Sequence, residues 1–294
     1  MMNKGWKKLG LLSLTATMLW GVGAPSVQAQ DLTTDELVNR VIKTSLQSKS
    51  VHTKVKFSMT HSDLEEKNTQ TVLDGELDAS LDLDKMAGKA EFGLAKFPGA
   101  SKVKLALVDG YLYGKADGKD LDRLDRIDLK SQVPSWKSDL ASMRQVETWI
   151  SPQDSGELAK YIQSVKEDQG YLLQLSEDID GKQLYRDYQQ LWDQVKQEAL
   201  HQLLLETSNP TIYGDFASFI DYVLNEEAFG AFMARKPKIL VQTDKDFRVT
   251  RVTVDFQFSI DQGMDLFSGL TGIFHVKLEA DLDQYDQAVS VEKP

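Results

Sequence analysis

Apolar and polar residues alternate along several stretches of the chain, and this alternation predicts β-strands. In residues 71–84, TVLDGELDASLDLD, leucine predominates at odd positions and aspartate or glutamate at even ones. Successive side chains of a strand point to opposite faces, so the leucines share one face and the carboxylates the other. Residues 51–59 and 86–94 keep the same rhythm. We therefore expect an antiparallel meander over 51–115, with one apolar and one solvated face.

Two short signals frame this meander. Before it, apolar residues recur at helical spacing, and Glu36 follows Thr33 at the spacing of a capping box. This pattern predicts an amphipathic helix whose apolar stripe is Leu37, Val38, Val41, Ile42 and Leu46. Within the meander, Asp109-Gly110 is a strong hairpin signal between two strands.

The middle of the chain, 134–232, is expected to be largely helical. Start and stop signals predict one helix over 151–170, with Gly170 as its end, and a long helix over 181–207. A further helix, starting at Asp215, is expected over 215–233. Between them, YLLQLSEDIDG is the one candidate strand.

Alternation returns in residues 237–285. A hairpin is expected around TDKD, with Val252, Val254, Phe256 and Phe258 on one face. The order helix, strands, helices, strands indicates an α+β fold: a curved antiparallel β-sheet, or half-barrel, with helices packed on its concave face. We favour one sheet that joins the first and last strands, while a second small sheet stays open. Residues 30–294 then form a single α+β domain.

Residues 1–29 have the features of a secretory signal peptide. Lysines precede a short apolar run, and small residues lead to a cleavage site after Ala29. The chain has no cysteine, which fits export from a bacterium, more often a Gram-positive one, and leaves no thiol for a lipid anchor. We expect a secreted or cell-wall protein without a stable membrane span; an uncleaved leader is the alternative.

The acidic composition narrows the classes of partner. Loss of the three leader lysines, Lys4, Lys7 and Lys8, takes the net charge from −11 to −14. Nucleic acids and anionic membranes need a basic surface, so neither is expected as a primary partner. A cell-envelope partner for the acidic surface stays possible.

The regularly spaced carboxylates are interpreted as the solvated side of the sheet. A calcium loop counted from Asp74 needs glycine at its sixth place and glutamate at its twelfth, but these places hold Ala79 and Lys85. Lys54 and Lys56 are placed to pair with the acids across the strands. The four histidines form no ligand pair, and no nucleophile elbow or phosphate loop is present. We expect no metal, no cofactor and no enzyme activity, with a hydrolase of unreadable signature as a minor alternative.

Aromatic residues are concentrated in the helical middle. They either fill the core or line an apolar space between helices and sheet, and such spaces hold lipid-like ligands. A glycine-flanked loop with two apolar residues is a candidate rim. The tentative ligand-binding residues are Trp192, Tyr188, Phe219, Tyr222, Leu266 and Phe267.

The order of these segments resembles a known group. A short helix, TTDELVNRVIKTSLQSKS, runs directly into VHTKVKFSM; DGYLYGK forms a hairpin, and VQTDKDFRVTRVTVDF opens the final strands. The chain looks like the LolA/LppX-like extracytoplasmic proteins, in an uncharacterised Gram-positive secreted branch. The resemblance implies a half-open antiparallel barrel covered by helices, with an apolar cavity that carries acyl chains in some members. Many lipoprotein members carry a lipidated cysteine, which this chain lacks.

The sequence therefore predicts a secreted, non-enzymatic binding protein. Its ligand would be apolar or amphiphilic and would lie between sheet and helices. The alternative is an envelope-associated interaction protein with a filled core and an acidic surface.

Overall fold

A computed structural model describes most of the expected domain. It covers residues 32–82, 85, 87–95, 102–108, 111–116, 119–120, 127–128, 159–189, 224–260 and 271–291, with single residues and pairs between 192 and 221. The expected leader, residues 134–150 of the expected helical middle and the loop 261–270 lie outside these residues.

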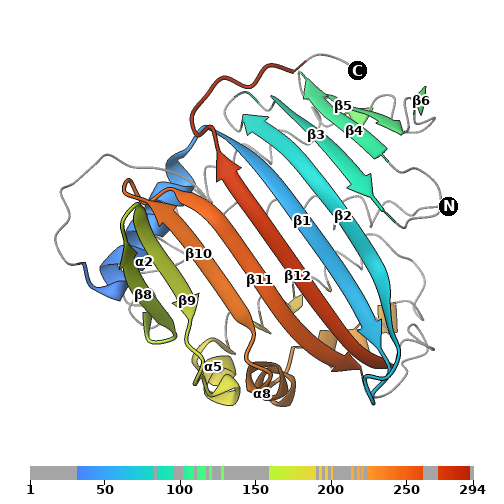
Figure 1. Cartoon of the computed structure of the whole chain (residues 1–294), viewed down its shortest axis with the longest axis vertical. Coiled ribbons are helices and arrows are strands. Elements are labelled where there is room, and N and C mark those ends of the chain that lie inside the picture. Colours follow the sequence, from blue (N-terminus) through green and yellow to red (C-terminus); the bar gives the residue numbers. More distant parts are fainter. Residues whose placement is uncertain are drawn as a thin grey trace.

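Within this part of the chain the fold is α+β, as predicted (Figure 1). The helices are α2 (Thr34–Gln47), α5 (Gly181–Asp187) and α8 (Glu226–Ala234). The strands are β1 (Ser50–Ser62), β2 (Thr69–Asp82), β3 (Ala87–Leu94), β4 (Lys102–Val108), β5 (Tyr111–Ala116), β6 (Lys119–Asp120), β7 (Ile127–Asp128), β8 (Ile162–Glu167), β9 (Gly170–Leu175), β10 (Lys238–Asp244), β11 (Val249–Ile260) and β12 (Gly272–Asp283).

The strands form one antiparallel sheet, which confirms the single-sheet prediction. Its order is β6-β5-β4-β3-β2-β1-β12-β11-β10-β9-β8, and β7 pairs with β5. The last strand, β12, lies between β1 and β11 and joins the two ends of the sequence (Figure 1). The sheet is open and is not strongly curled, so the expected half-barrel curvature is not reached.

The two faces of the sheet follow the predicted alternation. Val55 of β1 lies opposite Leu77 of β2 and Ala280 of β12, so these three apolar residues share one face. Along the central strands, apolar residues generally lie opposite apolar residues, and charged residues lie opposite charged ones. Gly75 interrupts the leucines at the one place where a side chain would not fit: a Cβ there would lie 2.6 Å from the Phe57 ring and from the Gly93 carbonyl oxygen. We call the side with these residues the apolar face.

Helix α2 closes one end of the apolar face. Its capping box is the predicted one, with Thr33 as N-cap and Glu36 hydrogen-bonded back to it. Leu37, Val38 and Val41 are buried against residues of the strands and of the β10–β11 turn, from both halves of the sequence. These partners are Val51, Val55, Tyr171, Leu173, Val241, Phe247, Val249, Ala280 and Leu282. The largest cluster of buried side chains therefore lies between α2 and the sheet.

The opposite, polar face carries the carboxylates, and cationic side chains face them across the strands. Lys54 Nζ lies 3.9 Å from Asp78, and Lys56 Nζ lies 3.8 Å from Glu76, as expected from their positions. Such exposed pairs each contribute under about 1 kcal/mol. Asp82 departs from the prediction of a solvated acid, because it is only 5% exposed and accepts a hydrogen bond from the Lys85 amide. Leu83 and Asp84 lie outside the described residues.

The expected helix over 151–170 is wrong in its described part. Residues 162–175 form the hairpin β8–β9, so the helical middle is interrupted by strands. Gly170 does not end a helix; it starts β9, where a Cβ would lie 1.8 Å from the Thr243 carbonyl oxygen. The strand expected over YLLQLSEDIDG is confirmed as β9. The glycine thus marks a close approach of two strands.

The expected helix over 215–233 is interrupted before its end. Residues 224–225 form a bend, and Asn225 caps α8 by accepting a hydrogen bond from the Ala228 amide at 2.8 Å. An asparagine side chain competes well for such an amide, which explains a new helix start inside a continuous apolar pattern. The predicted hairpin around TDKD is confirmed as β10–β11.

Candidate ligand-binding face

The apolar face has a covered end and a half-buried remainder, and β1 shows both. Val51, Thr53 and Val55 are 4–5% exposed beneath α2. Further along the same face of this strand, Phe57, Met59 and His61 are only half-buried. The most buried part of this strand is therefore the part that packs against α2.

Half-buried apolar side chains continue across the neighbouring strands. Phe57 stacks on Phe92 of β3, with ring centroids 5.5 Å apart. The other half-buried members on β2 to β4 and β11 to β12 are Leu73, Leu77, Leu94, Val103, Leu105, Leu107, Val254, Val276 and Leu278. Together these side chains form an apolar face that is only partly buried.

A row of rings links α8 to the far end of this face. Phe232 of α8 lies 5.4 Å from Phe256, followed by Phe258 at 6.1 Å, Phe274 at 5.1 Å and His61 at 4.8 Å, all measured between centroids. We call these five residues the aromatic row. Phe274 is buried, while Phe256 and Phe258 are half-buried. The row runs from the helices to the end of β1.

Two of the predicted ligand-binding residues lie near the start of this row. Tyr188 follows α5, and Trp192 is hydrogen-bonded to its carbonyl one turn later. Trp192 contacts Phe229 of α8 at 4.6 Å between centroids, and Phe229 is one turn from Phe232. The Trp192 indole N–H is buried and has no acceptor within the described residues. Trp192 is therefore packed beside α8, whereas the ring of Tyr188 contacts Tyr161 at 6.3 Å between centroids.

The other four predicted residues, Phe219, Tyr222, Leu266 and Phe267, lie outside the described residues. The strands that flank Leu266 and Phe267 are nevertheless placed. Ile260 of β11 pairs with Gly272 of β12 at the end of the sheet where the aromatic row finishes.

Sequence reasoning did not assign Phe256, Phe258 or His61 to the site. Phe256 and Phe258 were expected inward, but strand partners were needed to place them in line with Phe274 and α8. His61 has a readable signal, because the alternation of 51, 55, 57 and 59 continues to position 61. That rhythm alone puts a histidine on the apolar face.

The polar face holds a second notable group, centred on His52. Its Nδ1 lies 2.5 Å from Asp283 of β12, and its Nε2 lies 3.0 Å from Asp78 of β2. Desolvation acts to lower the pKa of His52, but the hydrogen bonds and charges of Asp283 and Asp78 outweigh it, so the pKa is raised above 6.5. Protonated His52 therefore bridges three adjacent strands.

This arrangement does not provide a catalytic base. Ser80 lies opposite His52 in the β1–β2 register, as a serine nucleophile would. Both ring nitrogens of His52 are bound by carboxylates, however, so neither can take a proton from the hydroxyl. The two carboxylates also lie on opposite sides of the ring, and within the described ranges no three acidic or histidine side chains converge as metal ligands.

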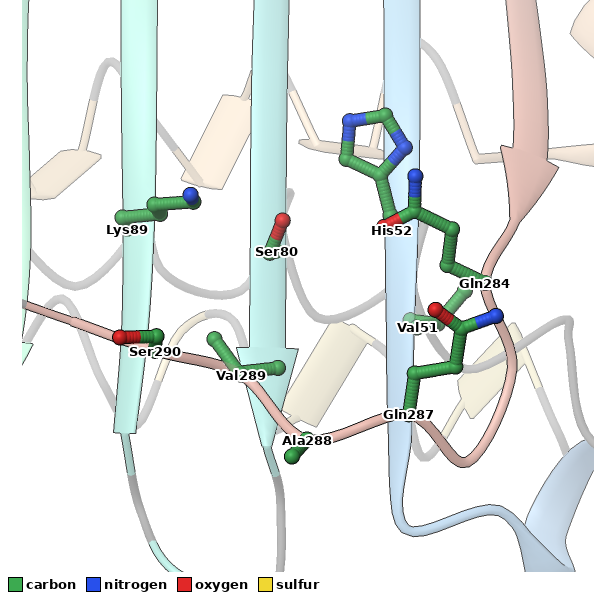
Figure 2. A pocket seen from close by; sticks show the side chains of 9 residues that line it. All are labelled: Val51, His52, Ser80, Lys89, Gln284, Gln287, Ala288, Val289 and Ser290. Atoms are coloured by element: carbon green, nitrogen blue, oxygen red, sulfur yellow. The ribbon is translucent and has the colours of Figure 1, made fainter.

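A shallow pocket lies beside His52, between the sheet and the C-terminal segment (Figure 2). Residues 284–290 cross the ends of β1, β2 and β3, and Ser50 Oγ donates a hydrogen bond to the Gln287 carbonyl at 2.6 Å. The space is about 70 Å³ and is lined by Val51, His52, Ser80, Lys89, Gln284, Gln287, Ala288, Val289 and Ser290. A space of this size has room for a few water molecules, whereas drug-sized ligands need about 300 Å³ or more.

Comparison with known proteins gives no family: no protein-family model and no curated protein matches the chain. In the part of the chain that the structure describes, we find no helix with the length and apolar content of a membrane span. The functional conclusion therefore rests on the two faces of the sheet.

Proposed function

We propose that this protein is a non-enzymatic binding protein that holds an apolar or amphiphilic, lipid-like ligand against the apolar face of its sheet. The observation that carries the proposal is the half-buried state of this face beyond α2. A filled core would bury Phe57, Phe256 and Phe258 as fully as it buries Val55. Burying the remaining apolar area of such side chains is worth about 25 cal/mol per Å², which is a driving force for an acyl chain.

The wider setting is part of the same proposal. The chain would be exported after cleavage near Ala29 and would work in the wall space or medium without a lipid anchor or cofactor. A half-open, LolA/LppX-like arrangement, with helices over a concave face, is the architecture that we infer for the loaded protein. The tentative contacts Trp192 and Tyr188 would lie at the α8 end of the ligand.

The alternative, an envelope-associated interaction protein acting through its acidic surface, draws less support. The carboxylates of the central strands lie opposite cationic partners: Arg251 Nε is 2.7 Å from Asp281, and Lys104 Nζ is 3.1 Å from Glu91. Such a surface attracts a cationic partner less than the net charge alone suggests. Affinity capture from cell-wall extracts, with identification of the captured protein, tests this role.

The test of the proposed function combines native mass spectrometry with a paired substitution. Protein purified from its own host is expected to carry co-purifying lipid and to bind a fluorescent fatty acid analogue. Phe258→Ser should weaken binding of the analogue by about tenfold, since it removes a large apolar contact. Gln257→Ser, the next residue on the opposite face, is the matched control and should leave binding unchanged. A clean apo mass together with no binding of the analogue would refute the proposal.

A further inference from the structure

We propose that His61 accepts a hydrogen bond from the polar end of the ligand, and that this end is therefore a neutral donor such as a hydroxyl. The inference rests on the proposed function and adds the chemical class of the ligand. It begins from the position of His61 at the end of the aromatic row, half-buried on the apolar face.

The neighbouring strands offer no charged partner for a ligand on this face. The side chains of β1, β11 and β12 that point to the apolar face are aliphatic or aromatic, apart from Thr53 and His61. Thr53 is buried beneath α2. On β2, the residue opposite His61 is Gln70, whose exposed amide is neutral. An ionised head group would thus lose water here without gaining a counter-charge on these strands.

The ring of His61 is held in one orientation. Its Nε2 lies 3.1 Å from the carbonyl oxygen of Thr271, and its plane rests at 42° on the Phe274 ring. Gly272 makes this approach possible: its φ is +150°, and a Cβ there would lie 2.4 Å from Nε2. The backbone at 271–272 and the Phe274 ring therefore fix where the other nitrogen points.

The Thr271 contact also decides which nitrogen carries the proton. A carbonyl oxygen only accepts hydrogen bonds, so Nε2 must donate. In the neutral ring the lone pair is then on Nδ1, which has no hydrogen-bond partner within the described residues. A fixed acceptor at the end of an apolar face favours a hydroxyl or amide and disfavours a carboxylate, which at neutral pH only accepts.

The test is competition for a neutral fluorescent probe, N-phenyl-1-naphthylamine, by monooleoylglycerol and by oleate at pH 8. The protein used is the chain without the expected leader, residues 30–294. Both competitors carry the same oleoyl chain. We expect the glyceride to compete more strongly than oleate, because the ionised head group loses water without a counter-charge and the hydroxyl gains a hydrogen bond. His61→Phe keeps the ring packing but removes the acceptor, so it should reduce this preference about three- to tenfold, the value of one hydrogen bond.

Two further variants make the result decisive. His61→Gln restores an acceptor and should restore part of the preference, while His275→Phe, a histidine on the polar face of the same sheet, should leave it intact. Equal competition by both lipids, a preference for oleate, or a preference that His61→Phe leaves unchanged would overturn the assignment of His61 and leave the binding function standing. Failure of the probe and of both lipids to bind would overturn the binding function as well.

Discussion

At the scale of single residues, the charge on His52 controls how β2, β1 and β12 are held together. Its raised pKa means that the folded protein binds this proton more tightly than the unfolded chain does. The stabilisation is complete below the unfolded pKa near 6.5 and is lost as the pH rises through the folded value. Other polar groups lie near the ring of His52. Lys54 lies near Asp78, and the pocket beside His52 is also lined by Ser80, Lys89, Gln284 and Gln287.

We therefore predict that the free energy of unfolding falls between pH 6 and pH 8.5, measured by urea denaturation. His52→Gln should be less stable than the wild type by about 1–3 kcal/mol at pH 6, because it loses two charge-assisted hydrogen bonds. The difference between the two proteins should shrink toward pH 8.5. A difference that stays constant over this range would show that the proton on His52 does not contribute.

Single residues also show which contacts could be predicted from the sequence and which could not. The alternation predicted that Lys54 and Lys56 lie on the same face as the acids of the neighbouring strand, and the β1–β2 register then identifies Asp78 and Glu76 as their partners. The second partner of His52 could not be predicted, since Asp283 comes from a strand more than two hundred residues away. The burial of Asp82 likewise depends on the local turn to Lys85 and not on the strand period.

At the scale of elements, α2 is the best-specified part of the chain. Its cap, its stripe and its place next to β1 were all readable, and Leu37 is only 1% exposed in the core. Strand β8 was misassigned to a helix because its few apolar residues fit a helical and a strand period equally well over so short a span. Its identity is decided by pairing with β9, a partner that the local pattern does not reveal.

Leu37→Ala should lower the free energy of unfolding by about 2–5 kcal/mol, since it leaves a cavity between α2 and five strands. The exposed Gln47 at the end of the same helix gives the control: Gln47→Ala should change stability by less than about 0.5 kcal/mol. Chemical denaturation monitored by far-UV circular dichroism measures both. Equal effects of the two substitutions would contradict the assignment of α2 as the main cover of the sheet.

At the scale of the whole molecule, the position of β12 makes the described sheet one unit. It shares its two edges with β1 and β11, so the N-terminal meander and the C-terminal strands have no separate core. Sequence patterns favoured a single sheet but could not give this order, because alternation fixes the faces of a strand and not its neighbours. The same limit explains why half-barrel curvature was expected where the sheet is open.

The single sheet predicts a single unfolding transition. Tryptophan fluorescence and far-UV circular dichroism should give coincident curves in urea, as for a two-state domain. A variant that ends at residue 271, and so lacks β12, should show no cooperative transition. Two resolved transitions in the full chain would indicate that the meander and the C-terminal strands fold independently.

The sequence predicted an apolar binding face, but it did not predict which residues form the candidate site. An apolar face bordered by aromatic helices follows from periodicity, and Trp192 lies beside α8 as part of that border. The alignment of Phe256, Phe258 and Phe274 required the β11–β12 register, and the orientation of His61 required the backbone of 271–272. Both are long-range features that no local pattern contains.

The central place of β12 has a consequence for biogenesis. Until Gly272–Asp283 leaves the ribosome, β1 and β11 each present an unsatisfied edge, and the native order of strands is unreachable. A nascent chain of this design can therefore reach its native order of strands only after the residues of β12 have been synthesised.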